Sequence, residues 1–201
     1  MPWTLSRPRA EELASRRDDA WGPKLDRRAA LAHSAGAATV VFGHTHIPMS
    51  IQHRGALLVN PGALASANVV GRQRLKTVAL LFVRVDGAPV VVHVDLAAPD
   101  QVFAPHIDWD AGYKAALDNV NASILSPALG ADWERLAPHV RALSPEQRRS
   151  LLLPLAHRCW NDERELITHA DVFAALHANT SIPDTTCAEL AAVLSQGYSR
   201  R

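Results

Sequence analysis

Hydrophobic and polar positions divide the chain into a helical start, a β-rich middle and a helical end. From about residue 9 to residue 36, alternating charges give way to an apolar stripe at helical spacing, which predicts helices. Gly22-Pro23 is expected to interrupt them, leaving a second helix over Lys24–His33 that Gly36 stops. The charged opening stretch is expected to be a solvated surface, although a cap over a site is an alternative.

The middle of the chain, residues 37–98, predicts strands because its apolar runs are short and rich in β-branched residues. Asp86-Gly87 predicts a hairpin turn, and the alternation around it predicts a sheet with one wet face. His93 is therefore expected to be a core or edge residue and not a ligand. The expected strands are Thr39–Phe42, Met49–His53, Ala56–Asn60, Thr77–Val85 and Pro89–Leu96.

The last hundred residues predict helices punctuated by proline. Ser144-Pro145-Glu146-Gln147 is a capping-box start signal, and Pro154 is expected to kink or end the helix that contains it. His169 and Asp171 are interpreted as a surface pair. Three aromatic side chains, Trp133, Trp160 and Phe173, are expected to anchor the core of a small helical module. The expected helices are Trp109–Leu125, Ala131–Leu143, Pro145–Cys159, Asp162–Ala178 and Thr185–Ser195.

Composition excludes several classes of protein but does not indicate a particular reaction. A formal net charge of +1 over 201 residues predicts no broad attraction to nucleic acid or to an acidic membrane. Cys159 and Cys187 are too few and too far apart for a disulfide framework or a zinc knuckle. No apolar run reaches the roughly 20 residues of a membrane span, and the start lacks the apolar core of a signal peptide. A cytoplasmic protein is expected, and the many Ala, Arg, Leu, Pro and Val residues suggest a GC-rich bacterial source.

The segment Gly43-His44-Thr45-His46-Ile47-Pro48 is the strongest candidate for chemistry. It directly follows the expected strand Thr39–Phe42, and such strand ends are where open α/β sheets place their active sites. Pro48 prevents a helix from starting there. His44 and His46 can point into one small volume, and neutral imidazole nitrogens bind metals such as zinc. Taken alone, the pair is also compatible with two solvated or hydrogen-bonded histidines.

A second motif, Asn60-Pro61-Gly62-Ala63, follows the next expected strand. Asn can bond its own backbone, Pro fixes φ and Gly supplies a positive φ, so the motif predicts a tight turn. Together the two motifs resemble the last signature of the calcineurin-like metallophosphoesterase family. That signature is a hydrophobic strand, Gly-His-Thr-His-x-Pro, a short hairpin and Asn-Pro-Gly-Ser. The match covers Val40–Pro48 and Val59–Ala63, with Ala63 in place of the usual Ser.

The resemblance implies a fold, a reaction and a cofactor. It implies an α+β chain in which residues 1–98 are the C-terminal half of a four-layer αββα sandwich, with a helical lead-in over 9–36 and a β-rich part over 37–98. Residues 99–201 would be a helical extension of unknown role. The implied activity is hydrolysis of a phosphomonoester or phosphodiester by a pair of divalent metal ions (Mn, Fe, Zn or Ni). His44 and His46 would each bind one ion, and the Asn60 turn would shape their loop.

The rest of the family's metal-binding residues are missing from this sequence. It contains no Asp-x-His, no Gly-Asp and no Gly-Asn-His. Two imidazoles are fewer than the three protein ligands of a typical catalytic zinc site, and no nearby carboxylate could bridge two ions. His33 could substitute for the family's middle His, but a position at a helix end is favoured. We expect an incomplete site in an inactive chain, whether truncated, completed by another chain or degenerate.

Two further expectations concern partners. Arg72 and Arg74 follow the Asn-Pro-Gly turn, where an Arg could hold a phosphate bidentately, although a plain surface role is favoured. The expected partner is a phosphoester substrate if an N-terminal half completes the site, with no nucleic acid and no membrane; the partner of the helical extension is unknown. The alternative function is a non-catalytic interaction module derived from a phosphoesterase.

Overall fold

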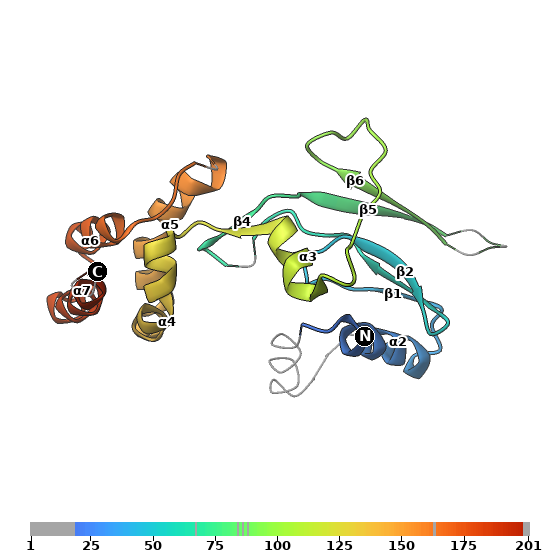
Figure 1. The fold of residues 1–201 in the computed structure, drawn as a ribbon, viewed down its shortest axis with the longest axis horizontal. Coiled ribbons are helices and arrows are strands. Elements are labelled where there is room, and N and C mark those ends of the chain that lie inside the picture. The colour runs from blue at the N-terminus through green and yellow to red at the C-terminus, as the bar shows by residue number, and fades with distance from the viewer. Residues whose placement is uncertain are drawn as a thin grey trace. The chain divides into compact units, whose positions relative to one another are not determined.

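The computed structural model describes residues 19–66, 68–83, 85, 87, 89–162 and 164–198 (Figure 1). This part of the chain is mixed α+β, as the sequence predicts, and it divides into two compact units. Among the described residues, the first unit holds 19–65 and 74–121, and the second holds 66–73 and 122–198. The charged stretch predicted at the start of the chain lies outside the described residues. No helix in the described ranges is long and apolar enough to cross a membrane.

The first unit opens with helix α2 (Trp21–Ser34). Its buried residues, Trp21, Leu25, Ala29 and Ala32, recur every three to four positions and form one apolar stripe. The predicted interruption at Gly22-Pro23 is wrong, because the helix already begins at Trp21. Pro23 lies in the first turn, where a backbone N–H has no partner within the helix, so its absence costs little.

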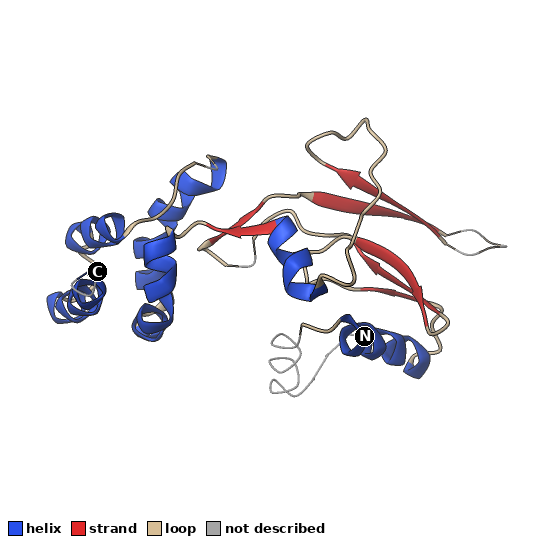
Figure 2. Ribbon diagram, in the orientation of Figure 1, coloured by secondary structure: helices blue, strands red, loops and turns tan. Residues whose placement is uncertain are grey.

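A three-stranded sheet lies against α2 (Figure 2). It comprises β1 (Thr39–Val41), β2 (Met49–His53) and β3 (Ala56–Asn60) in the order β1-β3-β2, with β1 parallel and β2 antiparallel to β3. Every residue of the central β3 is buried. The predicted bounds of β2 and β3 are confirmed, and β1 ends one residue earlier than predicted. The parallel register aligns Val41 with Val59, so the loop after β1 begins beside the end of β3.

Strands β5 (Thr77–Phe82) and β6 (Val90–Asp95) form an antiparallel ribbon in the same unit. Both are shorter than predicted, and Asp86 of the predicted hairpin turn lies outside the described residues. One face of the ribbon carries His93, which is buried as expected. The opposite face is wet, as predicted, but its residues are apolar and about half exposed: Leu80, Phe82, Val90 and Val92.

Helix α3 (Gly112–Val120) completes the first unit, and the prediction of one helix over Trp109–Leu125 is wrong at both ends. At its start, Gly112 has φ +86°, and a Cβ there would lie 2.2 Å from Asp19 Oδ2. Asp19 also accepts the backbone N–H of Lys114, which ties the helix start to the segment before α2. After Val120 the backbone becomes extended and enters a strand.

That strand, β7 (Asn121–Ser123), pairs with β4 (Gly71–Gln73) in a two-stranded sheet. Neither strand is predicted, because three residues are too few to show an alternating pattern. Four helices follow in the second unit: α4 (Pro127–Ala142), α5 (Pro145–Asn161), α6 (His169–Ala178) and α7 (Asp184–Tyr198).

Side-chain caps explain where helices α5 and α6 begin in the second unit. Ser144 and Gln147 form the predicted capping box at the start of α5. Pro154 does not end α5, which continues to Asn161. The predicted helix start at Asp162 is wrong, because α6 begins at His169 behind a second capping box between Thr168 and Asp171. The extended segment before that cap bridges to Leu125 through Ile167.

The core of the second unit is apolar and contains the buried free thiol of Cys159. Trp133, Trp160 and Phe173 pack against this core as predicted, although each is only partly buried. The surface interpretation of His169 is wrong: the residue is buried, and its Nε2 lies 2.9 Å from Asp132 Oδ2. The fully buried aliphatic residues of this core include Ile124, Leu129, Leu151, Ile167 and Leu194.

Candidate functional site

The two predicted metal ligands lie in the loop between β1 and β2 of the first unit. His44 (φ 75°) and His46 (φ 62°) both have left-handed backbones, which side-chain-bearing residues rarely adopt. Each such residue costs of order 1–3 kcal/mol unless its surroundings impose the conformation. His44 is exposed and His46 is half-buried, whereas Ile47 directly after them is almost completely buried. The loop therefore presents its imidazoles from an anchored backbone.

Asn60, the last residue of β3, holds this loop in place. Its side chain is completely buried, and its amide Nδ2 donates a hydrogen bond to Thr45 Oγ1, between the two histidines. Its Oδ1 accepts the backbone N–H of Gly62 at 2.9 Å. One buried amide thus joins the His-Thr-His loop to the Asn-Pro-Gly turn, and the predicted role of Asn60 in shaping the loop has a direct atomic basis.

The turn itself is fixed by the β5–β6 ribbon. Gly62 has φ +86°, and a Cβ there would lie 1.9 Å from Thr77 Oγ1, so a larger residue cannot fit without a shift. That hydroxyl donates to Pro61 O at 2.8 Å. From β6, buried His93 donates its Nε2–H to Asn60 O at 2.9 Å. Asn60 therefore receives support at its backbone while its side chain supports Thr45.

Sequence reasoning missed the roles of Thr77 and His93 in this network. His93 lies 33 positions after Asn60, and its surroundings in the sequence are a run of valines. A buried imidazole in such a run signals a polar partner somewhere in the fold, since buried polar groups are nearly always hydrogen-bonded. The partner itself can be found only once β6 is placed.

His33 is not brought to the loop. It is exposed in the last turn of α2, and a Cβ on Gly55 would lie 4.0 Å from its Nε2. Gly55 lies in the turn between β2 and β3, at the far end of β2 from the His-Thr-His loop. The length of that strand, roughly 13 Å at 3.3 Å per residue, separates the two positions. The substitution of His33 for a missing ligand is therefore not supported.

The donor set of the described residues does not fit a complete two-metal centre. Within the described ranges, no three or more His, Cys, Asp or Glu side chains gather where they could hold a metal ion. His44 and His46 share one loop, but a typical catalytic zinc site has three protein ligands, and a two-metal site holds its ions about 3.5–4 Å apart. No carboxylate of the described residues joins the two histidines to meet these requirements.

The two candidate phosphate-binding arginines have different environments. Arg72, in the second unit, is only 5% exposed, so its favoured surface role is wrong. Its guanidinium donates to Cys159 O at 2.7 Å, Asp162 O at 2.7 Å and Glu165 O at 3.0 Å. These carbonyls lie at and after the end of α5, so Arg72 closes that helix and is not available to a phosphate. Arg74, in the first unit, is exposed.

Comparison with known proteins agrees with the two motifs. The family model described as the calcineurin-like phosphoesterase superfamily domain matches residues 15–86, about a third of the chain. The match includes α2, the His-Thr-His loop, the Asn-Pro-Gly turn and β5. No curated protein and no solved structure matches the chain. The predicted boundary between residues 98 and 99 stays a prediction. Residues 15–86, which carry both motifs, are thus similar to the calcineurin-like phosphoesterase superfamily domain.

Proposed function

We propose that this chain is the C-terminal portion of a metal-dependent phosphoesterase. Its first unit contributes the C-terminal half of a four-layer αββα sandwich, and His44 and His46 are its share of a site for two divalent ions (Mn, Fe, Zn or Ni). A second polypeptide segment supplies the carboxylates and remaining ligands. The completed protein hydrolyses a phosphomonoester or a phosphodiester in the cytoplasm, and the chain by itself does not.

One observation carries this proposal: the buried Asn60 amide that fixes Thr45 between the two histidines. Ligand side chains bind a metal best when their supporting residues have already fixed their orientation. The left-handed backbones of His44 and His46 raise the free energy of the loop, and the hydrogen bonds of Asn60 offset part of that cost. A costly backbone held by buried hydrogen bonds, with an exposed imidazole at its tip, is the arrangement expected of a retained ligand loop.

The first test separates metal binding from catalysis in the purified chain. We expect Zn²⁺ to bind weakly by isothermal titration calorimetry, and the double variant His44→Ala, His46→Ala to lose that binding. His177→Ala, an exposed histidine in the second unit, is the matched control and should bind as the wild type does. Equal Zn²⁺ binding by the wild type and the double variant would remove these histidines from the proposal.

Catalysis is tested with p-nitrophenyl phosphate and Mn²⁺. We expect no metal-dependent hydrolysis by the wild-type chain above the rate of the double variant, because two imidazoles do not complete the site. Metal-dependent turnover that the double variant loses would contradict the need for a second segment. Coding sequence in frame before Met1 is a second check: Asp-x-His, Gly-Asp and Gly-Asn-His motifs there would identify the missing segment.

A second candidate function is a non-catalytic interaction module. The observation that favours it is the outward face of the β5–β6 ribbon, where Leu80, Phe82 and Val92 are about half exposed beside Val90. Contiguous exposed apolar side chains of this kind mark protein-interaction surfaces. Absence of metal binding, together with concentration-dependent association that Phe82→Ser abolishes in sedimentation experiments, would favour this candidate over the phosphoesterase.

A further inference from the structure

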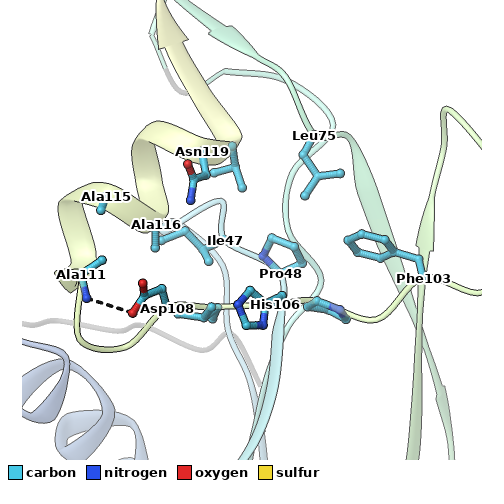
Figure 3. Close-up of a pocket in the computed structure, with 13 residues that line it drawn as sticks. Ile47, Pro48, Leu75, Phe103, His106, Asp108, Ala111, Ala115, Ala116 and Asn119 are labelled. Carbon is cyan, nitrogen blue, oxygen red and sulfur yellow. Dashed lines mark hydrogen bonds between the residues drawn. The ribbon is translucent and has the colours of Figure 1, made fainter.

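A hollow of about 110 Å³ opens in the first unit beside the His-Thr-His loop (Figure 3). Ile47 and Pro48 contribute one wall, and helix α3 contributes another. Phe103 and Leu75 lie across from the helix. Three polar side chains belong to the lining: His106, Asp108 and Asn119.

The hollow lies next in the chain to the two candidate metal-binding histidines. Ile47 directly follows His46, so the wall begins at a Cα about 3.8 Å from that of a proposed ligand. Most of the other lining residues come from 103–120, beyond the family match at 15–86. This segment is a fixed part of the unit, because Ala116 and Val120 belong to the same buried cluster as Trp21 and Ile47.

The lining favours a compact ligand that has both apolar and polar groups. Leu75, Phe103 and Ala115 line the hollow and are only partly buried, so they offer apolar surface to a group that gains from leaving water. An engineered cavity of about 150 Å³ accepts one benzene ring, so an open hollow of this size suits a single ring and not a nucleoside or a peptide.

The polar side chains of the lining further restrict the charge and the hydrogen-bonding groups of the ligand. Asp108 Oδ1 accepts the backbone N–H groups of Asp110 and Ala111, both at 3.1 Å, which fixes its carboxylate at the edge of the hollow. A carboxylate at this position repels an anionic ring and attracts a hydroxyl hydrogen. His106 is exposed beside it and can donate or accept a hydrogen bond. A neutral group of one ring that carries a hydroxyl meets both conditions.

We propose that this hollow binds the organic group of the substrate, a neutral single ring that carries a free hydroxyl in addition to its esterified oxygen, while the phosphate remains at the His-Thr-His loop. This inference rests on the proposed function and adds to it the class of phosphoester. Residues 103–120 are then specificity-determining residues, because they form most of the surface that the ring contacts.

The probe is benzyl alcohol, titrated into the ¹⁵N-labelled full chain and followed by ¹H–¹⁵N NMR. We expect shifts at Ala115, Ala116 and Asn119, and a dissociation constant of roughly 1 mM, as suits a ligand of this size. Ala115→Leu should weaken binding at least about tenfold, because the larger side chain occupies the space in which the ring would bury its apolar surface. Ala30→Leu, an exposed alanine on α2, is the matched control and should bind as the wild type does.

A second variant tests the hydroxyl contact. Asp108→Asn keeps an oxygen that can accept the two backbone N–H groups but removes the negative charge, so we expect roughly threefold to tenfold weaker binding. Thermal melts confirm that each variant is folded. Shifts confined to residues outside the lining, or binding by Ala115→Leu equal to that of the wild type, would overturn the proposal.

The double variant His44→Ala, His46→Ala separates this inference from the proposed function. It should bind benzyl alcohol as the wild type does, because neither histidine lines the hollow. Zn²⁺ binding without ring binding would overturn the hollow's assignment and leave the phosphoesterase proposal in place. Ring binding without Zn²⁺ binding would overturn the phosphoesterase and the ring's identity as a substrate group, while the ligand class would stand.

Discussion

Each unit contains a buried polar side chain that organises the backbone around it, but the two side chains support different things. Asn60 in the first unit joins the His-Thr-His loop to the Asn-Pro-Gly turn. Arg72 in the second unit joins three carbonyls at and after the end of α5. Both are at most 5% exposed. The loop that Asn60 supports, however, carries the exposed imidazole of His44. Arg72 instead donates its hydrogen bonds to carbonyls at the C-terminal end of α5.

What distinguishes the surroundings of Asn60 from those of Arg72 is an exposed histidine side chain, because both regions contain a buried hydrogen-bond network. Asn60 and Arg72 are both buried and hydrogen-bonded, so these two properties do not show which of them supports a functional site. The family resemblance would even make Arg72 a candidate for phosphate binding. Of the two networks, only the one around Asn60 supports a loop with an exposed imidazole, that of His44. Three changes test this difference, and the first should have the greatest consequence.

Arg72→Met should have the largest effect and should be confined to stability. It leaves three carbonyl groups without their charged donor, so we expect the free energy of unfolding of the second unit to fall by about 3 kcal/mol. Urea denaturation followed by the fluorescence of Trp133 and Trp160 measures the loss. Arg74→Met, at an exposed position, is the matched control and should change stability by less than about 0.5 kcal/mol. Weaker Zn²⁺ binding in folded Arg72→Met would remove the distinction between the two networks.

Asn60→Ala should have a smaller effect on stability and an additional effect on metal binding. Loss of the buried amide leaves the Gly62 N–H without its acceptor, which we expect to cost about 2 kcal/mol. Because the variant also releases Thr45, Zn²⁺ affinity should fall roughly 10–100-fold. Calorimetry on the folded variant measures this, with exposed Asn68→Ala as the control. Unchanged affinity in Asn60→Ala would mean that the loop needs no support from this residue.

Acidification should have the smallest effect and should fall on the second unit. The hydrogen bond from His169 is the largest cause that lowers the pKa of Asp132, and the hydrogen bond from Arg164 is the largest that lowers the pKa of Asp162. A carboxyl whose pKa is lower in the folded state stabilises the fold above its unfolded value of 3.8, and that stabilisation is lost as the pH falls through the lowered value.

The resulting expectation is a modest decrease in the melting temperature of the second unit as the pH falls from neutral to below the unfolded value of 3.8. Circular dichroism melts of the full chain over this range measure the decrease. Asp132→Asn should flatten part of the profile, because the variant lacks the titrating carboxyl. A profile that is identical in wild type and variant would show that the pair of Asp132 and His169 does not contribute to acid sensitivity.

The accuracy of the strand predictions depends on how local the signal is. Strands β2 and β3 have the predicted bounds, because both are continuous runs that end at turn-forming residues. Strands β4 and β7 have three residues each and form only because they pair with one another. For the same reason the helix predicted over Trp109–Leu125 ends at Val120, where pairing in β7 replaces helical hydrogen bonds.

Helix ends follow a similar rule. The capping box at Ser144 is local, and it is predicted correctly from four consecutive residues. The start of α3 depends on Asp19, more than ninety positions earlier, which accepts the N–H of Lys114. The capping box at Thr168 and Asp171 is also local but is not predicted, because the apolar pattern before it extends the expected helix too far.

Residue order alone specifies the α+β class, the superfamily motifs, the two candidate ligands and the absence of the family's other metal-binding motifs. These features follow from short stretches, in which backbone preference and side-chain chemistry act locally. Only tertiary packing brings His93 to Asn60 across 33 positions and Arg72 to Cys159 across 87. Packing also places residues 103–120 beside the His-Thr-His loop, where they form most of the lining of the hollow. A buried polar group must find a hydrogen-bond partner, and distance in space, not in sequence, determines which partner lies within reach.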